Sequence, residues 1–161
     1  MSAILSPCGT FRYRLDREVQ AAGLVFAWFG VNPSTADATL DDQTVRKWRG
    51  FTQRNGGRRF IVGNVFSFRA TDVGALASIE NDCGPEHWEH LHAIIAEADI
   101  LVPCWGRRSK LPANKRQRPL ELLEVLRASG KPLMHLGLTK DGDPTHPLTL
   151  GYDTPLLRWA A

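Results

Sequence analysis

Four short apolar runs, separated by more polar segments, are the sequence feature that most constrains the fold. Each run has six to nine residues. The first two are rich in β-branched and aromatic side chains, which is typical of strands. Apolar residues follow one another without strict alternation, and this indicates strands that are buried on both faces, as in a parallel sheet. The runs are Leu24–Val31, Phe60–Phe68, Ile100–Trp105 and Pro132–Leu138.

The segments between these runs carry helix signals, such as acids or a proline at the start and glycine at the end. Strands that alternate with helices imply an α/β fold with right-handed crossovers. We therefore expect a three-layer α/β/α sandwich with a central, mainly parallel four-stranded sheet. Thr10–Glu18 alternates apolar and polar residues and is expected to add an N-terminal edge strand. The expected helices are Asp41–Asn55, Pro85–Ala98, Leu120–Ala128 and a shorter one over Asp72–Ile79.

Length and composition are those of one globular domain, which we place over residues 1–161. The chain has 161 residues, of which 43% are hydrophobic and 23% charged. No apolar run approaches the roughly 18 residues that cross a bilayer, and the N-terminus lacks the layout of a secretory signal. The three cysteines, an odd number at wide spacing, do not suggest a disulfide framework. We expect a cytoplasmic monomer that does not associate with a membrane.

The net charge of +3 conceals two basic windows without a single acid. Residues 43–71 and 105–119 together hold 13 of the 20 lysines and arginines. Such polarisation is typical of a protein that binds a polyanion, although two solvated basic faces would give the same count. On the first interpretation, phosphate contacts with DNA are expected from Arg46, Arg69, Arg107, Arg108, Lys110, Lys115 and Arg116.

Function in α/β folds gathers at the carboxyl ends of the strands, and polar residues follow two of the expected strands there. Asn32 is held extended by the proline after it, so its amide can orient a water molecule. The alternative is that Asn32 or Ser34 only caps a turn or helix. Asn64 can pair with backbone or can read a nucleobase edge. Phe66 and Phe68 share one face and belong either to the core or to a base-stacking platform.

His146 lies in the loop after the last apolar run, where it is a candidate for electrostatic or acid–base chemistry. His135 lies inside that run and is expected to be a core histidine. His87, His90 and His92 cluster on one expected helix, but no third ligand accompanies the pair that shares a face. The sequence has no zinc-ligand spacing, P-loop, dinucleotide fingerprint or nucleophile elbow. We therefore expect neither a metal nor a cofactor.

The sequence resembles a known family in four segments. The first begins at Gly30-Val31-Asn32-Pro33 and reads GVNPSTADATLDD, and the second runs from Asn64 to Asp72. The third is Trp105-Gly106, and the fourth is GLTKDGDPTHPL, from Gly137 to Leu148. Together they resemble a bacterial and phage family catalogued only as a domain of unknown function, over roughly Thr10 to Trp159. That resemblance by itself implies no activity.

The order of these motifs is also similar to the uracil-DNA glycosylase superfamily, in its mismatch-specific and single-strand-selective branches. In that superfamily a first strand ends in Gly-x-Asn-Pro, here Gly30–Pro33, and a second ends in an asparagine that reads the base, here Asn64. A third strand ends in a small residue, here Gly106, and a His-Pro motif follows the last strand, here His146-Pro147.

The resemblance implies a role for each of these residues. Asn32 would position the water that attacks the sugar C1′, Asn64 would read the extruded base, and His146 would stabilise negative charge on the departing base. Leu148 would wedge into the vacated stack, unless it packs in the core. Ser34 stands where the glycosylases usually have glycine, so the base pocket is expected to differ.

Two acidic residues leave it open which side chain activates the attacking water. Asp37 or Asp42 could activate the water or bind a sugar hydroxyl, in which case Asn32 would be structural. Asp42 could equally be an acid at a helix N-terminus. The cysteines are too few for an iron–sulfur cluster.

We therefore expect a DNA repair hydrolase, an N-glycosylase that removes uracil or a modified pyrimidine from single- or double-stranded DNA. One alternative is an enzyme of the same fold that acts on free or hypermodified nucleotides. Another is a non-catalytic nucleic-acid-binding protein. The basic windows favour a polymer over a free nucleoside.

Overall fold

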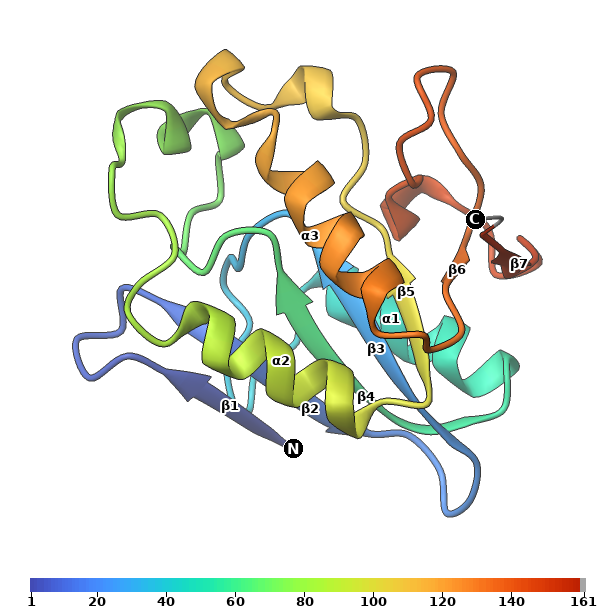
Figure 1. The fold of residues 1–161 in the computed structure, drawn as a ribbon. Coiled ribbons are helices and arrows are strands. Elements are labelled where there is room, and N and C mark those ends of the chain that lie inside the picture. The colour runs from blue at the N-terminus through green and yellow to red at the C-terminus, as the bar shows by residue number, and fades with distance from the viewer. Residues whose placement is uncertain (160–161) are drawn as a thin grey trace.

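A mixed α/β fold with a five-stranded sheet is seen in the computed structural model, which describes residues 1–159 (Figure 1). The strand order is β1-β2-β4-β3-β5. These strands span Ser2–Leu5 (β1), Arg12–Glu18 (β2), Leu24–Gly30 (β3), Gly57–Asn64 (β4) and Ile100–Pro103 (β5). The helices are Gln43–Arg54 (α1), His87–Glu97 (α2) and Arg118–Ala128 (α3), and Met134–His135 (β6) and Leu157–Arg158 (β7) form a second, two-stranded sheet.

The sheet is mixed rather than mainly parallel. β3 runs parallel to both β4 and β5, whereas β2 runs antiparallel to β4 and to β1. The prediction of a fourth parallel strand over Pro132–Leu138 is corrected. Only an isolated bridge from Leu133 to Leu101 links this segment to β5, and β6 pairs instead with β7.

The expected N-terminal edge strand is also placed differently. β2 occupies most of Thr10–Glu18, but it lies between β1 and β4 and is not an edge. β1 takes the edge position, although its four residues gave no strand signal of their own. Short strands form because of their partner, and here Ala3 pairs with Leu15 of β2.

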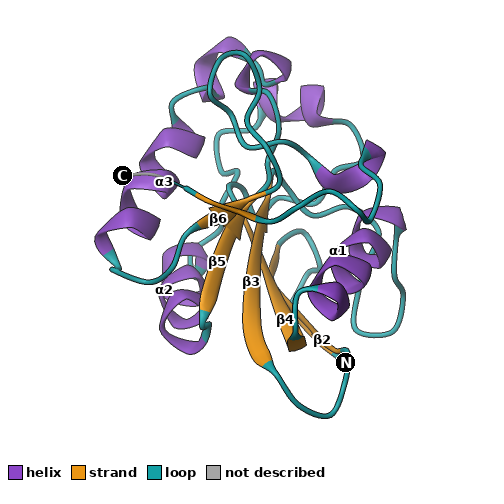
Figure 2. Ribbon diagram, turned by 90° about the vertical axis from the view of Figure 1, so that its right-hand side faces the viewer, coloured by secondary structure: helices purple, strands orange, loops and turns teal. Residues whose placement is uncertain are grey.

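Helices cover both faces of the sheet: α1 lies on one side, and α2 and α3 lie on the other (Figure 2). Alternate residues of β3 supply the two apolar clusters. Ala27 and Phe29 pack in the cluster that includes Leu91 of α2 and Leu122 of α3. Phe26 and Trp28 pack in the cluster that includes Val45 and Phe51 of α1. Burial on both faces explains why β3 is a continuous apolar run in the sequence.

The helix boundaries follow local signals closely. The carboxylate of Asp42 caps α1 by accepting a hydrogen bond from the Val45 amide at 3.0 Å, and Gly56 follows the helix with a φ of 78°. The expected short helix over Asp72–Ile79 is a 3-10 helix over Val73–Ser78. Among residues 1–159, none of the helices is long and apolar enough to cross a membrane.

Candidate functional site

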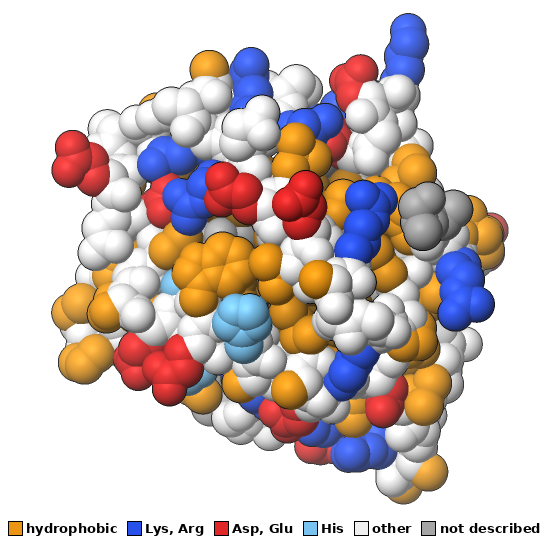
Figure 3. All heavy atoms as spheres, viewed as in Figure 1, with side chains coloured by type: hydrophobic (Ala, Val, Ile, Leu, Met, Phe, Trp, Pro, Cys, Tyr) orange, Lys and Arg blue, Asp and Glu red, His pale blue; other side chains and the backbone are white. Residues whose placement is uncertain are grey.

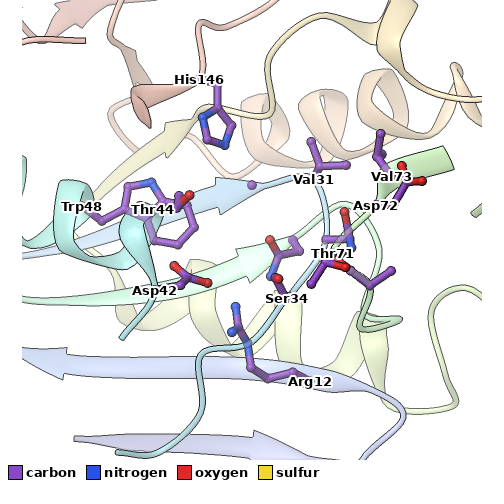
Figure 4. A pocket seen from close by; sticks show the side chains of 14 residues that line it. Arg12, Val31, Ser34, Asp42, Thr44, Trp48, Thr71, Asp72, Val73 and His146 are labelled. Carbon is purple, nitrogen blue, oxygen red and sulfur yellow. Dashed lines mark hydrogen bonds between the residues drawn. The ribbon is translucent and has the colours of Figure 1, made fainter. Parts of the chain in front are cut away.

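The ends of three strands meet at one edge of the sheet and form a cavity of about 360 Å³ (Figure 4). Gly30 and Asn64 end the parallel strands β3 and β4 and pair directly with each other. Arg12 begins β2, and because β2 runs antiparallel to β4 its first residue lies at the same edge. All three residues line the cavity, together with four residues that, unlike Arg12, the sequence singled out: Asn32, Ser34, Asp42 and His146.

Asn32 joins the loop after β3 to the loop after β4. Its side-chain Nδ2 donates hydrogen bonds to the carbonyl of Pro33 at 3.1 Å and to the carbonyl of Ala70 at 2.8 Å. The carbonyl of Pro33 in turn accepts from the Ala70 amide at 2.9 Å. The Nδ2 group is thus used to hold the loops, and Oδ1 is left to accept a hydrogen bond within the cavity.

Asn64 is buried, with 4% of its surface exposed, yet its side-chain amide has no hydrogen-bond partner among the described residues. The amide lines the cavity with its donor and its acceptor both unused, so this side chain is suited to a ligand that supplies both a donor and an acceptor. Gly30 leaves room for it, because a Cβ atom on Gly30 would lie 2.9 Å from Oδ1 of Asn64. The alternative that the Asn64 side chain pairs with backbone is not observed among the residues that the structure describes.

His146 approaches the cavity from the side opposite Arg12 (Figure 4). Its Nδ1 accepts a hydrogen bond from the Leu148 amide at 3.2 Å, so the neutral ring carries its proton on Nε2. Burial is the main cause that lowers the pKa of His146, and Lys110 lowers it further, while Asp42 acts in the opposite direction. At neutral pH the ring is therefore a neutral hydrogen-bond donor.

The two candidate acids have different surroundings. Asp42 lines the cavity while one of its oxygens caps α1, so it is both a helix N-terminal acid and a group of the site. Asp37 does not line the cavity. Its carboxylate accepts from the amides of Thr39 and Leu40, both at 2.9 Å, and these hydrogen bonds lower its pKa. Asp37 therefore stabilises the turn in which it lies, and Asp42 is the acid that the fold brings to the site.

The two phenylalanines do not form a stacking platform at the cavity. Phe66 is fully buried in the core cluster beneath α2 and α3, with the Arg118 guanidinium 5.2 Å from its ring centre. Of the two alternatives expected for Phe66, core or base-stacking platform, the structure thus places it in the core, where it is closed to a base. Phe68 is partly buried, packs edge-on against Phe11 and lines a neighbouring cavity with Arg69.

The basic residues of the two windows divide into paired and free groups. Lys115 is buried and pairs with Asp82 at 2.7 Å, so its expected contact with DNA is corrected. Arg108 pairs with Asp143 at 2.6 Å. Figure 3 shows basic and acidic side chains interspersed over the face formed by α2 and α3, without a continuous basic patch.

Other basic side chains remain accessible near the cavity. Arg107 and Lys110 are exposed and line two neighbouring cavities that also include His146. Arg69 is half-buried and donates from Nε to the Ser34 carbonyl at 3.2 Å. Arg46 and Arg116 are also exposed. Leu148 is 40% exposed and is not part of either core cluster.

Sequence reasoning missed Arg12, Thr44 and Trp48, which also line the cavity. Arg12 lies outside both basic windows, and only the interior position of β2 buries it. Thr44 and Trp48 lie in the first turns of α1, whose N-terminal end lies beside the cavity. Helical spacing could identify the buried face of α1, but it could not show that this face reaches a site.

The fold and the site define the class of protein: a mixed α/β protein with a polar, ligand-sized cavity at the carboxyl ends of its parallel strands. Residues 12–148 match the family described as a protein of unknown function (DUF1643), and the chain belongs to this family. The search of curated proteins and the search of solved structures found no match. The resemblance to the uracil-DNA glycosylases therefore stays a prediction.

Proposed function

We propose that this protein is a DNA base-excising N-glycosylase, which hydrolyses the bond between deoxyribose and uracil or a modified pyrimidine. The observation that carries the proposal is the convergence of Asn32, Asn64 and His146 on one cavity, each with a hydrogen-bonding group that has no partner among the described residues. The cavity volume of about 360 Å³ suits a single nucleoside. The proposal includes the three-layer arrangement of the glycosylase superfamily, which the helices on both faces of the sheet support.

The proposed reaction uses these groups in distinct roles. Asn64 presents a donor and an acceptor to the polar edge of an extruded base. Oδ1 of Asn32 accepts a hydrogen bond from a water molecule that attacks C1′. As the bond from C1′ to the base nitrogen breaks, its electron pair leaves with the base, and the Nε2–H of His146 stabilises that charge. Asp42 takes the proton that the attacking water releases, and the base is protonated by solvent after it leaves.

A neutral histidine suits this role. Cleavage produces an electron-rich base and an electron-poor sugar, so a neutral donor near the base stabilises the transition state without placing a cation near the sugar. Burial already keeps the pKa of His146 low, and the Leu148 amide fixes the proton on Nε2. The geometry of the loop that bears His146 is thus consistent with electrophilic assistance.

Neighbouring hollows support a polymeric ligand. The cavity shares Ser34, Ala70 and Thr71 with a hollow that reaches Arg69, and it shares His146 with the hollows that reach Arg107 and Lys110. Basic side chains thus lie on both sides of the polar cavity, as expected for a strand whose phosphates flank an extruded nucleotide.

The proposal is tested by incubating the protein with single- and double-stranded oligonucleotides that contain uracil or 5-substituted uracils. We expect alkali-labile sites and release of the free base, measured by mass spectrometry. Asn32→Ala and His146→Ala should each reduce base release at least 100-fold, which is the size of a lost acid–base or electrostatic contact, about 10²–10³. His92→Ala, at an exposed position on α2, is the matched control and should leave the rate unchanged.

Two outcomes would contradict the proposal. The first is the absence of free base across the whole panel while binding to DNA is retained, which would favour a binding protein. The second is full activity in both Asn32→Ala and His146→Ala, which would remove the proposed site even if base release occurs.

A further inference from the structure

Arg12 is a buried cation that lines the cavity, and the proposed function gives it no role. Only 3% of its surface is exposed. In Figure 4 its side chain rises from β2 and directs the guanidinium group toward Asp42 and Ser34. Arg12 is thus positioned at the opposite side of the cavity from His146.

The guanidinium of Arg12 has few partners. Nη1 donates to the Ala36 carbonyl at 2.9 Å, whereas Nε is buried and has no hydrogen-bond partner in the described part of the chain. Among residues 1–159, no carboxylate lies within 4.0 Å of the group. A buried arginine normally has a carboxylate or several carbonyl groups around it, so this arginine is incompletely compensated.

Arg17, on the same strand, shows what a compensated arginine looks like. It is 1% exposed, and its Nε donates to the Asp41 carboxylate at 2.7 Å. Its two Nη atoms donate to backbone carbonyls, among them that of Asp16 at 2.9 Å. The fold therefore pairs one buried arginine of β2 fully and leaves the other directed at a cavity.

The charged groups around Arg12 do not neutralise it locally. Asp42 and Asp37 attract it, whereas Arg69 and Arg17 repel it. Each of these two carboxylates accepts hydrogen bonds from backbone amides of its own segment. Burial lowers the pKa of Arg12 to about 10, which still leaves the group protonated at neutral pH. The cavity thus holds a cation that lacks a direct counter-ion.

We propose that Arg12 anchors an oxyanion subsite within this cavity and that the subsite binds the phosphate group of a nucleotide. A planar guanidinium with unused N–H groups matches the geometry of phosphate oxygens. The lining residues Ser34, Thr44 and Thr71 bring hydroxyl groups that can add hydrogen bonds. The same chemistry is offered by inorganic phosphate, by a terminal monoester and by an internal diester. The proposal rests on the proposed function only in assigning the ligand to the nucleotides.

The experiment measures affinity and needs no catalysis. Inorganic phosphate, deoxyuridine 5′-monophosphate, deoxyuridine and a short uracil oligonucleotide are titrated by calorimetry into wild type, Arg12→Met and Arg12→Lys at fixed ionic strength. We expect wild type to bind the monophosphate at least tenfold more tightly than deoxyuridine. Arg12→Met should lose this preference. Arg12→Lys, which keeps the positive charge but not the planar set of N–H donors, should retain part of it.

Arg14→Met is the matched control, because Arg14 lies on the same strand but pairs with Asp16 and Glu97 away from the cavity. It should keep the wild-type preference for phosphate. If Arg12→Met does not fold, the Nε resonance of Arg12 in wild type provides a second measurement. It should shift when inorganic phosphate is added and should not shift with an equal concentration of chloride.

The four titrations distinguish the possible sources of the phosphate group. They also distinguish a failure of this proposal from a failure of the proposed function. If only the affinity for the oligonucleotide depends on Arg12, the subsite binds a phosphodiester. If the affinities for the monophosphate and for inorganic phosphate depend on Arg12, the subsite binds a phosphomonoester. Phosphate binding without base release would refute the glycosylase and leave the subsite standing. The subsite would be overturned if wild type bound neither the monophosphate nor the oligonucleotide more tightly than deoxyuridine. It would also be overturned if Arg12→Met kept the wild-type preference for these ligands, even if bases are released.

Discussion

At the scale of single residues, the two asparagines of the cavity differ in what they contribute to stability. Asn32 makes two hydrogen bonds, of which the one to the Ala70 carbonyl joins two loops, whereas the Asn64 side chain has no protein partner among the described residues. A typical hydrogen bond contributes about 0.5–1.5 kcal/mol. The two side chains can therefore be distinguished by measuring stability and activity separately.

We predict that Asn32→Ala lowers the free energy of unfolding by about 1–3 kcal/mol, since it removes two such bonds. Asn64→Ala should change this free energy by less than about 0.5 kcal/mol, because no partner is left unpaired. Both variants should lose base release. Urea titration gives the stabilities, and a large loss of stability in Asn64→Ala would show that the side chain has a structural partner.

His87 makes stability depend on pH. It is 3% exposed, its Nδ1 lies 2.6 Å from the Ser67 hydroxyl, and its Nε2 has no hydrogen-bond partner within residues 1–159. Burial is the main cause that lowers the pKa of His87 to about 4, and Arg118 contributes, while Asp82 opposes. The unfolded chain binds a proton near the ordinary histidine pKa of about 6.5, whereas the folded chain does not.

We therefore predict that the contribution of His87 to stability is complete above about pH 6.5 and is lost as the pH falls toward 4. This pKa difference corresponds to about 3 kcal/mol, at about 1.4 kcal/mol for each pH unit. His87→Gln should flatten this part of the pH profile of urea unfolding, and His92→Gln, at an exposed position, should not. Equal pH slopes in wild type and His87→Gln would contradict the expected burial.

At the scale of elements, the first turn of α1 combines a structural and a chemical role in one residue. Asp42 caps the helix and also lines the cavity, so replacing it with alanine removes both functions. Asparagine keeps the capping oxygen but cannot accept a proton as a carboxylate does. The pair of substitutions thus separates the cap from the chemistry.

We predict that Asp42→Asn retains stability within about 0.5 kcal/mol, whereas Asp42→Ala loses about 1 kcal/mol. Base release should fall about 100-fold in both, as expected for loss of a general base. Thermal unfolding and mass spectrometry of the released base measure the two effects. Full activity in Asp42→Asn would reduce the role of this residue to helix capping.

The elements were predictable where their signals are local. β3 and β5 lie within apolar runs of the sequence, and the Asp42 cap and Gly56 mark the ends of α1 as expected. β1 and the failure of Pro132–Leu138 to extend the sheet were not predictable. Both depend on which distant strand is available for pairing, and this information is not contained in the segment itself.

At the scale of the whole molecule, the two basic windows do not act as units. Lys115 and Arg108 are paired with acids, whereas Arg107 and Lys110 are exposed beside His146. Only part of the sequence-level charge bias is therefore available to a polyanion. The expected electrostatic contribution is correspondingly smaller than a count of 13 basic residues suggests.

We predict that affinity for DNA falls as salt rises, because each phosphate contact releases counter-ions. The double variant Arg107→Ala/Lys110→Ala should weaken binding and reduce the slope of log K against log salt by about 2, or about 1 for each lost contact. Arg127→Ala is the control, because Arg127 is an exposed residue of α3 that lies near Trp159. A salt-independent affinity would remove the case for phosphate contacts.

The sequence by itself determined the local features: the apolar strands, the helix signals, and the polar residues Asn32, Asn64 and His146 at strand ends or in the loops that follow them. These features depend on neighbours along the chain, so a pattern of residue types is enough to find them. Only the tertiary structure decided that Arg12 reaches the cavity, that Lys115 is buried against Asp82, and that Phe66 belongs to the core. The physical reason is that burial and charge pairing arise between segments far apart in sequence, and the antiparallel placement of β2 beside β4 brings Arg12 to the edge where Asn64 ends its strand.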